Sequence, residues 1–268
     1  MHQFADRRLS FGSIAEQYDA VRPDYPQPVI NTVLDFAGTG PGGRVLEIGA
    51  GTGQATAQLA AAGLNVLAVE PSAEMAEVMR QRFSEPLSGG AVEVQVSDFE
   101  TAQFPDGEFD LVFAATVWHW LTERVRWELT LRALKPGATV AAIWHWPLWR
   151  RSSLRPELDA VYLQSGADLS QMGALLEVEP TIQALGGEWL VDAPSPDAVT
   201  DACGLEQLWS DSYSAAEYVA LINTYADHIA LTPEIRERLD NAVGEVIERG
   251  GGTITLPYKT LVVMARKR

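Results

Sequence analysis

The stretch Val45-Leu-Glu-Ile-Gly-Ala-Gly-Thr-Gly53 decides how this chain folds. An apolar run followed by glycines at every second position predicts a strand that enters a tight loop. A second apolar run, Val66-Leu-Ala-Val69, ends at Glu70. A strand, a glycine loop, a helix and a second strand with an acid at its end are the parts of a nucleotide-type binding site.

The spacing of the glycines indicates which kind of nucleotide. A dinucleotide fingerprint needs Gly-x-Gly-x-x-Gly, because the third glycine lets the helix pack close to the strand. Counted from Gly49 the third position is Gln54, and counted from Gly51 it is Thr56. Neither is glycine, so the spacing argues against an NAD-dependent oxidoreductase.

Composition limits the partners of the chain. Its 268 residues fit one large domain, or a domain with a cap. A formal charge of −16 argues against nucleic acid and against an acidic membrane surface. The single Cys203 excludes an intrachain disulfide, and neither an apolar run of membrane-spanning length nor a secretory signal is visible. We expect a cytoplasmic protein.

Strands and helices alternate through the first half of the chain, which predicts an α/β fold with a doubly wound parallel sheet. Ligands bind such sheets beyond the carboxyl ends of the strands. Gly49, Glu70, Asp98 and Ala115 all follow or end expected strands. The expected strands are Arg44–Ile48, Asn65–Glu70, Val92–Ser97, Phe109–Ala115 and Ala138–Ile143, and the expected helices are Gly53–Ala62, Pro71–Phe83 and Thr122–Leu134.

Three motifs in sequence order resemble those of class I S-adenosylmethionine-dependent methyltransferases. They are Glu47-x-Gly49-x-Gly51-x-Gly53, Phe109-Asp-Leu-Val-Phe113 and Leu134-Lys-Pro-Gly137, and the resemblance covers residues 44–143. It implies a Rossmann-like, seven-stranded, mostly parallel sheet whose last strand is antiparallel. Leu205–Tyr213 and Tyr258–Arg266 would be its sixth and seventh strands.

The resemblance also implies S-adenosylmethionine as cofactor, with S-adenosylhomocysteine as product. The glycine loop would pass under the methionine and ribose, and Glu70 would bind both ribose hydroxyls. Asp98 would accept from the adenine amino group and Phe99 would flank the ring. A turn residue or a helix cap is the alternative for Asp98. The expected cofactor residues are Tyr18, Arg22, Glu47, Gly49, Gly51, Gly53, Glu70, Pro71, Asp98, Phe99 and Ala115.

The N-terminal segment from Phe11 to Pro26 resembles the leader of small-molecule methyltransferases similar to trans-aconitate methyltransferase and its type 11 relatives. In that group the leader folds over the cofactor. Tyr18 and Arg22 would therefore close the site, with Arg22 near the methionine carboxylate. The alternative is a surface helix that ends at Pro23 and forms ion pairs of its own.

We expect four parts along the chain. Residues 1–35 form the leader over the cofactor, and residues 36–146 form the cofactor-binding core. Residues 147–204 form a mainly helical lid. Residues 205–268 hold the last two strands, with a helical insertion at about 214–251 composed of Ala215–Ala230 and Pro233–Arg249. The apolar stripe that includes Tyr218 and Tyr225 is expected to be helix packing.

Aromatic residues mark the expected place of chemistry. Trp118-His119-Trp120 directly follows the fourth strand, and Trp144-His145-Trp146 directly follows the fifth. Tryptophans exclude water and favour a positive sulfonium by about 0.5–2 kcal/mol. His119 is the candidate general base for a hydroxyl or amine acceptor, whereas a carboxylate acceptor would need no base. The expected substrate residues are Trp118, Trp144, His145 and Trp146, and packing between the sheet and the lid is the alternative for all of them.

The sequence therefore predicts a methyltransferase that moves the methyl of S-adenosylmethionine to a small molecule. O-methylation of an organic acid or secondary metabolite is what the resemblance implies. A cofactor-binding, non-catalytic or regulatory member of the fold is the alternative. A nucleic-acid enzyme is disfavoured, because Ala114-Ala-Thr-Val117 stands where adenine-N6 enzymes have Asn-Pro-Pro-Tyr. We expect a monomer or homodimer and assign no metal site.

Overall fold

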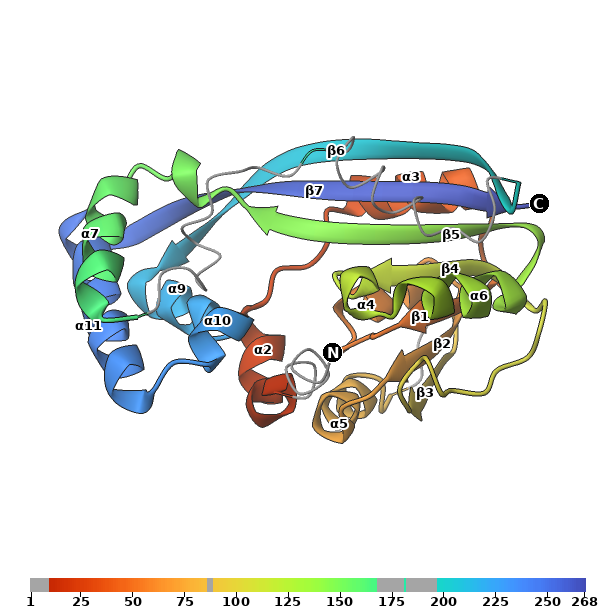
Figure 1. Ribbon diagram of the computed structural model, residues 1–268, viewed down its shortest axis with the longest axis horizontal. Coiled ribbons are helices and arrows are strands. Elements are labelled where there is room, and N and C mark those ends of the chain that lie inside the picture. The colour runs from red at the N-terminus through yellow and green to blue at the C-terminus, as the bar shows by residue number, and fades with distance from the viewer. Residues whose placement is uncertain (1–9, 86–88, 168–180, 182–196) are drawn as a thin grey trace.

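The computed structural model describes residues 10–85, 89–167, 181 and 197–268, and its centre is one seven-stranded sheet (Figure 1). The strand order is β3-β2-β1-β4-β5-β7-β6. The strands are β1 (Arg44–Ile48), β2 (Asn65–Glu70), β3 (Val92–Val96), β4 (Phe109–Ala115), β5 (Leu134–Pro147), β6 (Val199–Ser214) and β7 (Thr253–Lys267).

The pairing confirms the predicted mostly parallel sheet with an antiparallel last strand. β1 pairs in parallel with both β2 and β4, and β2–β3 and β4–β5 are also parallel. β7 runs antiparallel to its two neighbours, β5 and β6. The strand order reverses between β1 and β4, which is where sheets of this kind bind ligands.

Helices cover both faces of the sheet. α3 (Gln27–Ala37), α4 (Gln54–Ala61) and α5 (Ala73–Arg82) pack on one face, and α6 (Glu123–Ala133) packs on the other. The predicted ends of α4, α5 and α6 agree with the observed ends to within two residues. Ser72 caps α5 by accepting from the Met75 backbone nitrogen, and Gly63 follows α4 with φ +86°.

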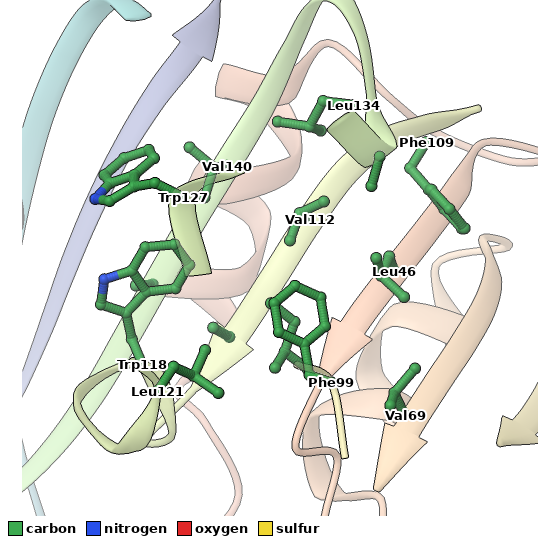
Figure 2. Packing of buried hydrophobic residues seen from close by; sticks show 14 of the residues in the cluster. Leu46, Val69, Phe99, Phe109, Val112, Trp118, Leu121, Trp127, Leu134 and Val140 are labelled. Atoms are coloured by element: carbon green, nitrogen blue, oxygen red, sulfur yellow. The ribbon is translucent and has the colours of Figure 1, made fainter. Parts of the chain in front are cut away.

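Each face has its own hydrophobic core. The core on the α6 face joins Leu46, Val69 and Val112 of the strands to Trp127 of α6 (Figure 2). Alternate residues of the same strands point to the opposite face, where Val45 and Phe113 pack with the helices there. Because both faces are covered, the strands are apolar throughout, as the sequence shows.

The helical cap, defined as α7 (Arg155–Ser165), α9 (Ala215–Ile222), α10 (Ala226–Ile229) and α11 (Pro233–Arg249), lies at one end of the sheet (Figure 1). It has a third core, which includes Tyr162, Tyr218 and Leu239. Tyr218 lies in this core, which confirms packing for that part of the stripe. The expected helix Ala215–Ala230 is divided into α9 and α10, because the chain turns through residues 223–225.

The last three strands are longer than predicted. β5 continues to Pro147, which lies opposite Tyr258 of β7. β6 pairs with β7 from Val199 to Ser214. The prediction that the fifth strand ends at Ile143 was wrong, because pairing with β7 keeps the residues that follow Ile143 extended. Trp144, His145 and Trp146 therefore lie within β5 and not after it.

The N-terminal segment lies between the sheet domain and the cap. It forms a short 3-10 helix η1 (Ser10–Ile14) and then α2 (Ala15–Val21), which packs between α5 and α9 (Figure 1). Of the expected lid, the structure describes the short helix η3 (Trp149–Arg151) and α7, while residues 168–180 and 182–196 lie outside the described residues. No helix in the described part of the chain has the length and apolar character to cross a membrane.

Candidate active site

The glycine loop after β1 has the backbone that its residues predict. Gly49, Gly51 and Gly53 have φ of 61°, 61° and 93°, a region that side chains rarely adopt. A Cβ on Gly49 would lie 2.5 Å from Cγ2 of Val117, whereas one on Gly51 would meet nothing closer than 3.8 Å. Gly53 begins α4 and packs against Met79. Gly49 and Gly51 border the pocket described below, and Gly53 does not.

Glu70 holds this loop in place from the end of β2. One carboxylate oxygen accepts from the Gly51 backbone nitrogen at 2.9 Å, and the other accepts from the Ser72 nitrogen at 2.9 Å. Burial raises the pKa of Glu70, and these two hydrogen bonds oppose the rise. Glu70 does not line the pocket, and neither does Pro71, which is half-buried after β2.

Glu47 is a buried carboxyl at the pocket side of β1. Its side chain is 1% exposed, and one oxygen accepts from the Thr56 hydroxyl at 2.7 Å. Burial raises the pKa of Glu47 to about 8, and the nearby Glu70 adds to the rise. Glu47 is therefore mostly protonated at pH 7.

An open pocket lies beyond the carboxyl ends of β1, β4 and β5. Its position agrees with the ligand site expected for this strand order. Seven of the predicted site residues line it: Tyr18, Arg22, Glu47, Gly49, Gly51, Ala115 and His145.

Arg22 is the positive charge of the pocket. Its guanidinium lies 4.8 Å from the ring centre of Tyr18 and 4.3 Å from that of Tyr225. Its Nε donates to the Thr224 hydroxyl at 2.8 Å and its Nη2 to the Thr224 carbonyl at 2.7 Å. The leader also has an ion pair of its own, between Asp19 and Arg82 of α5. The leader is thus attached to both the core and the cap.

The alternation of β5 separates its three aromatic residues. Successive side chains of a strand point to opposite faces. Trp144 packs in the core on the α6 face, whereas His145 lines the pocket. Trp146 is half-buried and does not line the pocket. Of the substrate residues predicted from this triplet, the structure therefore brings only His145 to the pocket.

His119 lies away from the pocket, on the short helix η2 (Trp118–Trp120). The indole nitrogen of Trp144 donates to its Nδ1 at 3.1 Å, so the ring proton is on Nε2. Burial of the imidazole, and to a smaller extent the positive charge of Arg126, lower the pKa of His119, although part of the residue is exposed. Neither nitrogen is free to accept a proton, and the placement does not support the predicted role as general base.

Three further predicted residues serve the protein's own structure. Trp118 is 2% exposed and packs edge-on against Trp127 (Figure 2). Phe99 is 3% exposed and stacks on Phe104 in the same core, so it cannot flank a ring in the pocket. Asp98 accepts from the Glu100 backbone nitrogen at 2.9 Å, which is the turn role named as its alternative.

Nine of the lining residues were not predicted as site residues, and Tyr25, Thr116, Tyr225 and Tyr258 are among them. The Tyr25 hydroxyl is 3.1 Å from the Thr116 hydroxyl. Thr116 has φ +59°, which is uncommon for a β-branched residue and typical of functional sites. Tyr225 packs against the core of the cap as expected, and its ring also lines the pocket and faces Arg22.

Known proteins that are similar in sequence are named methyltransferases. A family model described as a methyltransferase domain matches residues 46–142, from β1 to β5. An uncharacterized methyltransferase of Mycobacterium tuberculosis (strain H37Rv) is 29% identical over 262 residues, which cover 97% of this chain and 96% of that protein. One from Bacillus licheniformis is 36% identical over 118 residues, 43% of this chain and 50% of that protein. These matches support a methyltransferase whose core, from β1 to β5, is similar to a methyltransferase domain.

Solved structures share the fold of this methyltransferase. A type II methyltransferase candidate from Anaeromyxobacter dehalogenans has a TM-score of 0.60 at 22% identity, covering 91% of this chain and 97% of that one. Phosphoethanolamine N-methyltransferase 2 of Haemonchus contortus, in complex with S-adenosylmethionine, has a TM-score of 0.53 at 16% identity, covering 96% of this chain and 57% of that one. At these identities the likeness shows the fold alone.

Proposed function

We propose that this methyltransferase moves the methyl group of S-adenosylmethionine to an oxygen atom of a small organic acid or secondary metabolite. The observation that carries the proposal is one pocket that joins the glycine loop to a wall of aromatic side chains around Arg22. The loop side suits the cofactor, and the aromatic side suits a small polar acceptor.

Several residues fit the cofactor. Gly51 leaves open space where a side chain would stand, which suits a ligand that passes close to the backbone. Each oxygen of Glu70 accepts one backbone N–H and keeps a further lone pair for a ribose hydroxyl. Glu47 and Arg22 line the same pocket and could pair with the amino and carboxylate groups of the methionine portion. The predicted ribose and carboxylate contacts remain part of the proposal.

When bound, the cofactor supplies a methyl group already activated by a positive sulfur. The chain then has to align the acceptor and exclude water. Tyr18 and Arg22 cover the pocket from α2, and Tyr225 and Tyr258 bound it on the cap side. Contacts of the N-terminal segment with both the sheet domain and the cap hold this cover in place.

A cofactor-binding member of the fold without turnover is the second candidate. This candidate is favoured for acceptors that must lose a proton. His119 lies outside the described pocket, and burial lowers the pKa of His145, the histidine that lines it, to about 3, so His145 is a weak base. An acceptor that already carries a negatively charged oxygen needs no base, so the position of His119 does not argue against its methylation. The expected cytoplasmic location and the absence of nucleic-acid and membrane partners rest on composition and belong to the proposal.

Incubation with methyl-labelled S-adenosylmethionine and a panel of small organic acids tests the proposal. We expect label in at least one product as an alkali-labile methyl ester, with S-adenosylhomocysteine formed in equal amount. Arg22→Gln should reduce this transfer, and Arg249→Gln, an exposed residue at the end of α11, is the matched control. Tight binding of S-adenosylhomocysteine without transfer to any acid would favour the non-catalytic candidate.

A further inference from the structure

We propose that Thr116 is a specificity-determining residue whose hydroxyl group, oriented by Tyr25, donates a hydrogen bond to the oxygen-bearing group that takes the methyl. The inference rests on the proposed function and concerns the choice of the accepting atom. It stands on one contact between two hydroxyl groups, on a strained backbone and on the place of both residues in the lining of the pocket.

The side chains of Tyr25 and Thr116 meet at the wall of the pocket. Their hydroxyl oxygens lie 3.1 Å apart. Tyr25 precedes α3 and Thr116 directly follows β4, and both residues line the pocket. Both are half-buried, so each keeps part of its surface exposed. Neither residue is among those expected to contact the cofactor, so their hydroxyl groups are available to the methyl acceptor.

The backbone of Thr116 is strained. Its φ is +59°, close to the +61° of Gly49 and Gly51 in the glycine loop. Glycine adopts this region without strain, whereas a β-branched residue rarely does, and such outliers gather at functional sites. The Thr116 backbone nitrogen donates to the Ile143 carbonyl at 2.7 Å, a bond that glycine would form equally well. The hydroxyl is the group that glycine could not supply.

Tyr25 is held at both its backbone and its ring. The Gln58 side chain of α4 accepts from the Tyr25 backbone nitrogen at 3.3 Å and donates to the Tyr25 carbonyl at 2.7 Å. The ring stacks on His145, with ring centres 4.1 Å apart and planes 14° apart. The protein itself therefore holds the phenol beside Thr116, which lowers the entropic cost of ordering the pair.

The pair of hydroxyl groups has one hydrogen to spare. Two hydroxyls that bond to each other use one of their two hydrogens. A phenol is more acidic than an aliphatic alcohol and is the better donor, so Tyr25 donates to Thr116. Within the described residues the Thr116 hydroxyl has no further polar partner, and its own hydrogen is left for a ligand. The bond from Tyr25 polarises this hydroxyl and strengthens it as a donor.

This donor favours oxygen over nitrogen as the accepting atom. An oxygen-bearing group has several lone pairs, so one can attack the methyl carbon while another accepts from Thr116. A neutral amine has a single lone pair, which the reaction uses, and an ammonium group has none. An amine would therefore leave the Thr116 hydrogen unpaired, and a site that loses a hydrogen bond in this way discriminates against such a ligand.

The organic acids of the proposed function fit this donor. Their carboxylate already carries the negative charge, so no proton leaves during the transfer. One C–O bond forms and the C–S bond breaks, and the electron pair of the C–S bond stays on sulfur. Thr116 keeps its proton and positions the carboxylate.

The availability of the Thr116 hydroxyl can be tested without an acceptor. In a crystal structure with S-adenosylhomocysteine we expect an ordered water in the pocket within about 3.0 Å of Thr116 Oγ1, in the place of the acceptor oxygen. Thr116→Val has the same shape without the hydroxyl and should lose this water. A Thr116 Oγ1 that is enclosed by protein atoms, or that bonds to S-adenosylhomocysteine, would overturn the proposal.

The role in the reaction is tested with the acid of the transfer panel that takes the most label. Thr116→Val should lower kcat/KM for this acid about tenfold, through the loss of one hydrogen bond, and should change S-adenosylhomocysteine affinity less than about twofold. Thr116→Ser keeps the hydroxyl and should recover most of the activity. Thr32→Val removes a hydroxyl from the exposed face of α3 and is the matched control.

Selectivity gives a readout that a purely structural role would not move. The ratio of transfer to the acid over transfer to an amine of the same carbon skeleton should fall about tenfold in Thr116→Val, because the amine does not use the lost bond. An equal ratio in wild type and Thr116→Val would overturn the proposal. So would a loss of activity that Thr116→Ser shares in full.

We assign Tyr25 as a positioning residue, because it acts through Thr116. Tyr25→Phe keeps the ring that stacks on His145 and should lower kcat/KM about threefold. In the Thr116→Val background it should have no further effect, because the hydroxyl that it orients is gone. Losses that multiply, or a loss in Tyr25→Phe greater than that in Thr116→Val, would show that Tyr25 itself donates to the acceptor.

Two outcomes separate this proposal from the proposed function. Transfer to an acid that Thr116→Val carries out as well as wild type would leave the proposed function intact and overturn the role of Thr116. If S-adenosylhomocysteine binds but no acid takes label, the proposed function is wrong. In that case an ordered water on Thr116 Oγ1 would still support a hydroxyl donor in the pocket.

Discussion

The Glu70 carboxylate accepts a hydrogen bond of 2.9 Å from the backbone nitrogen of Gly51. This contact joins the acid at the end of β2 to the middle of the glycine loop after β1. The two sequence features that indicated a nucleotide-type site are therefore in direct contact. Glu70 organises the loop in addition to its proposed role at the ribose.

Glu70→Ala should weaken S-adenosylhomocysteine binding by about 2–4 kcal/mol. Charge-assisted hydrogen bonds contribute about 1.5–3 kcal/mol each, and water compensates in part for their loss. Calorimetric titration measures the change. Glu77→Ala removes an exposed acid from α5 and is the matched control. Equal affinity in wild type and Glu70→Ala would exclude Glu70 from the site.

Two glycines of the loop should respond differently to alanine. Gly49→Ala adds a Cβ 2.5 Å from Val117 at φ +61°, so we expect a loss of about 2–4 kcal/mol in the free energy of unfolding. Gly51→Ala has the same φ and no close neighbour, so about 1 kcal/mol is expected. Urea unfolding compares the two. Gly49→Ala combined with Val117→Ala should recover part of the loss, and no recovery would refute the packing argument.

His119→Asn should leave methyl transfer within twofold of wild type. The residue lies outside the pocket, and its Nδ1 is occupied by Trp144. The variant should lose about 1–2 kcal/mol in the free energy of unfolding, because the hydrogen bond to the indole nitrogen is weakened. Steady-state kinetics with an acceptor found in the organic-acid screen compares the turnover of the variant with that of wild type. A hundredfold loss of turnover would restore His119 as a base.

Glu47 should make the fold less stable as the pH rises. Its pKa is about 8 in the folded chain and 4.5 is its ordinary value, so the folded state binds the proton more tightly. The resulting stability is complete below pH 4.5 and is lost as the pH rises through 8. Between about pH 6.5 and 8 we expect a fall of about 2 kcal/mol, at 1.36 kcal/mol per unit.

Glu47→Gln is the control for this pH dependence. The amide oxygen can still accept from the Thr56 hydroxyl, but the side chain does not titrate. Urea unfolding of both proteins at about pH 6.5 and at pH 8 measures the difference. Parallel pH profiles for wild type and variant would show that Glu47 is already ionised in the folded chain.

The first four strands could be predicted from the sequence because their signals are local. β1, β2 and β4 have the predicted bounds; Gly49 follows the first of them and the acid Glu70 ends the second. Left-handed backbone at Gly49, Gly51 and Gly53 follows from the need for glycine there. The residues that set the conformation of the loop lie next to one another in the chain, so this conformation could be predicted from the sequence alone.

The aromatic side of the pocket could not be predicted because it depends on pairing between distant residues. Whether Trp144 or His145 faces the pocket depends on how far β5 continues, and that is decided by its pairing with β7. Tyr258 and Tyr225 come from β7 and from the turn before α10, more than a hundred residues after the glycine loop. The contact between Tyr225 and Arg22 forms only when the cap has folded onto the N-terminal segment.

A crystal structure of the complex with S-adenosylhomocysteine tests the central claim most directly. We predict the ligand in the pocket that Glu47, Gly51 and Arg22 line, with its ribose hydroxyls at Glu70 and its sulfur on the side that faces His145. Ligand bound elsewhere, or a pocket that stays free of ligand at saturating S-adenosylhomocysteine, would contradict the account.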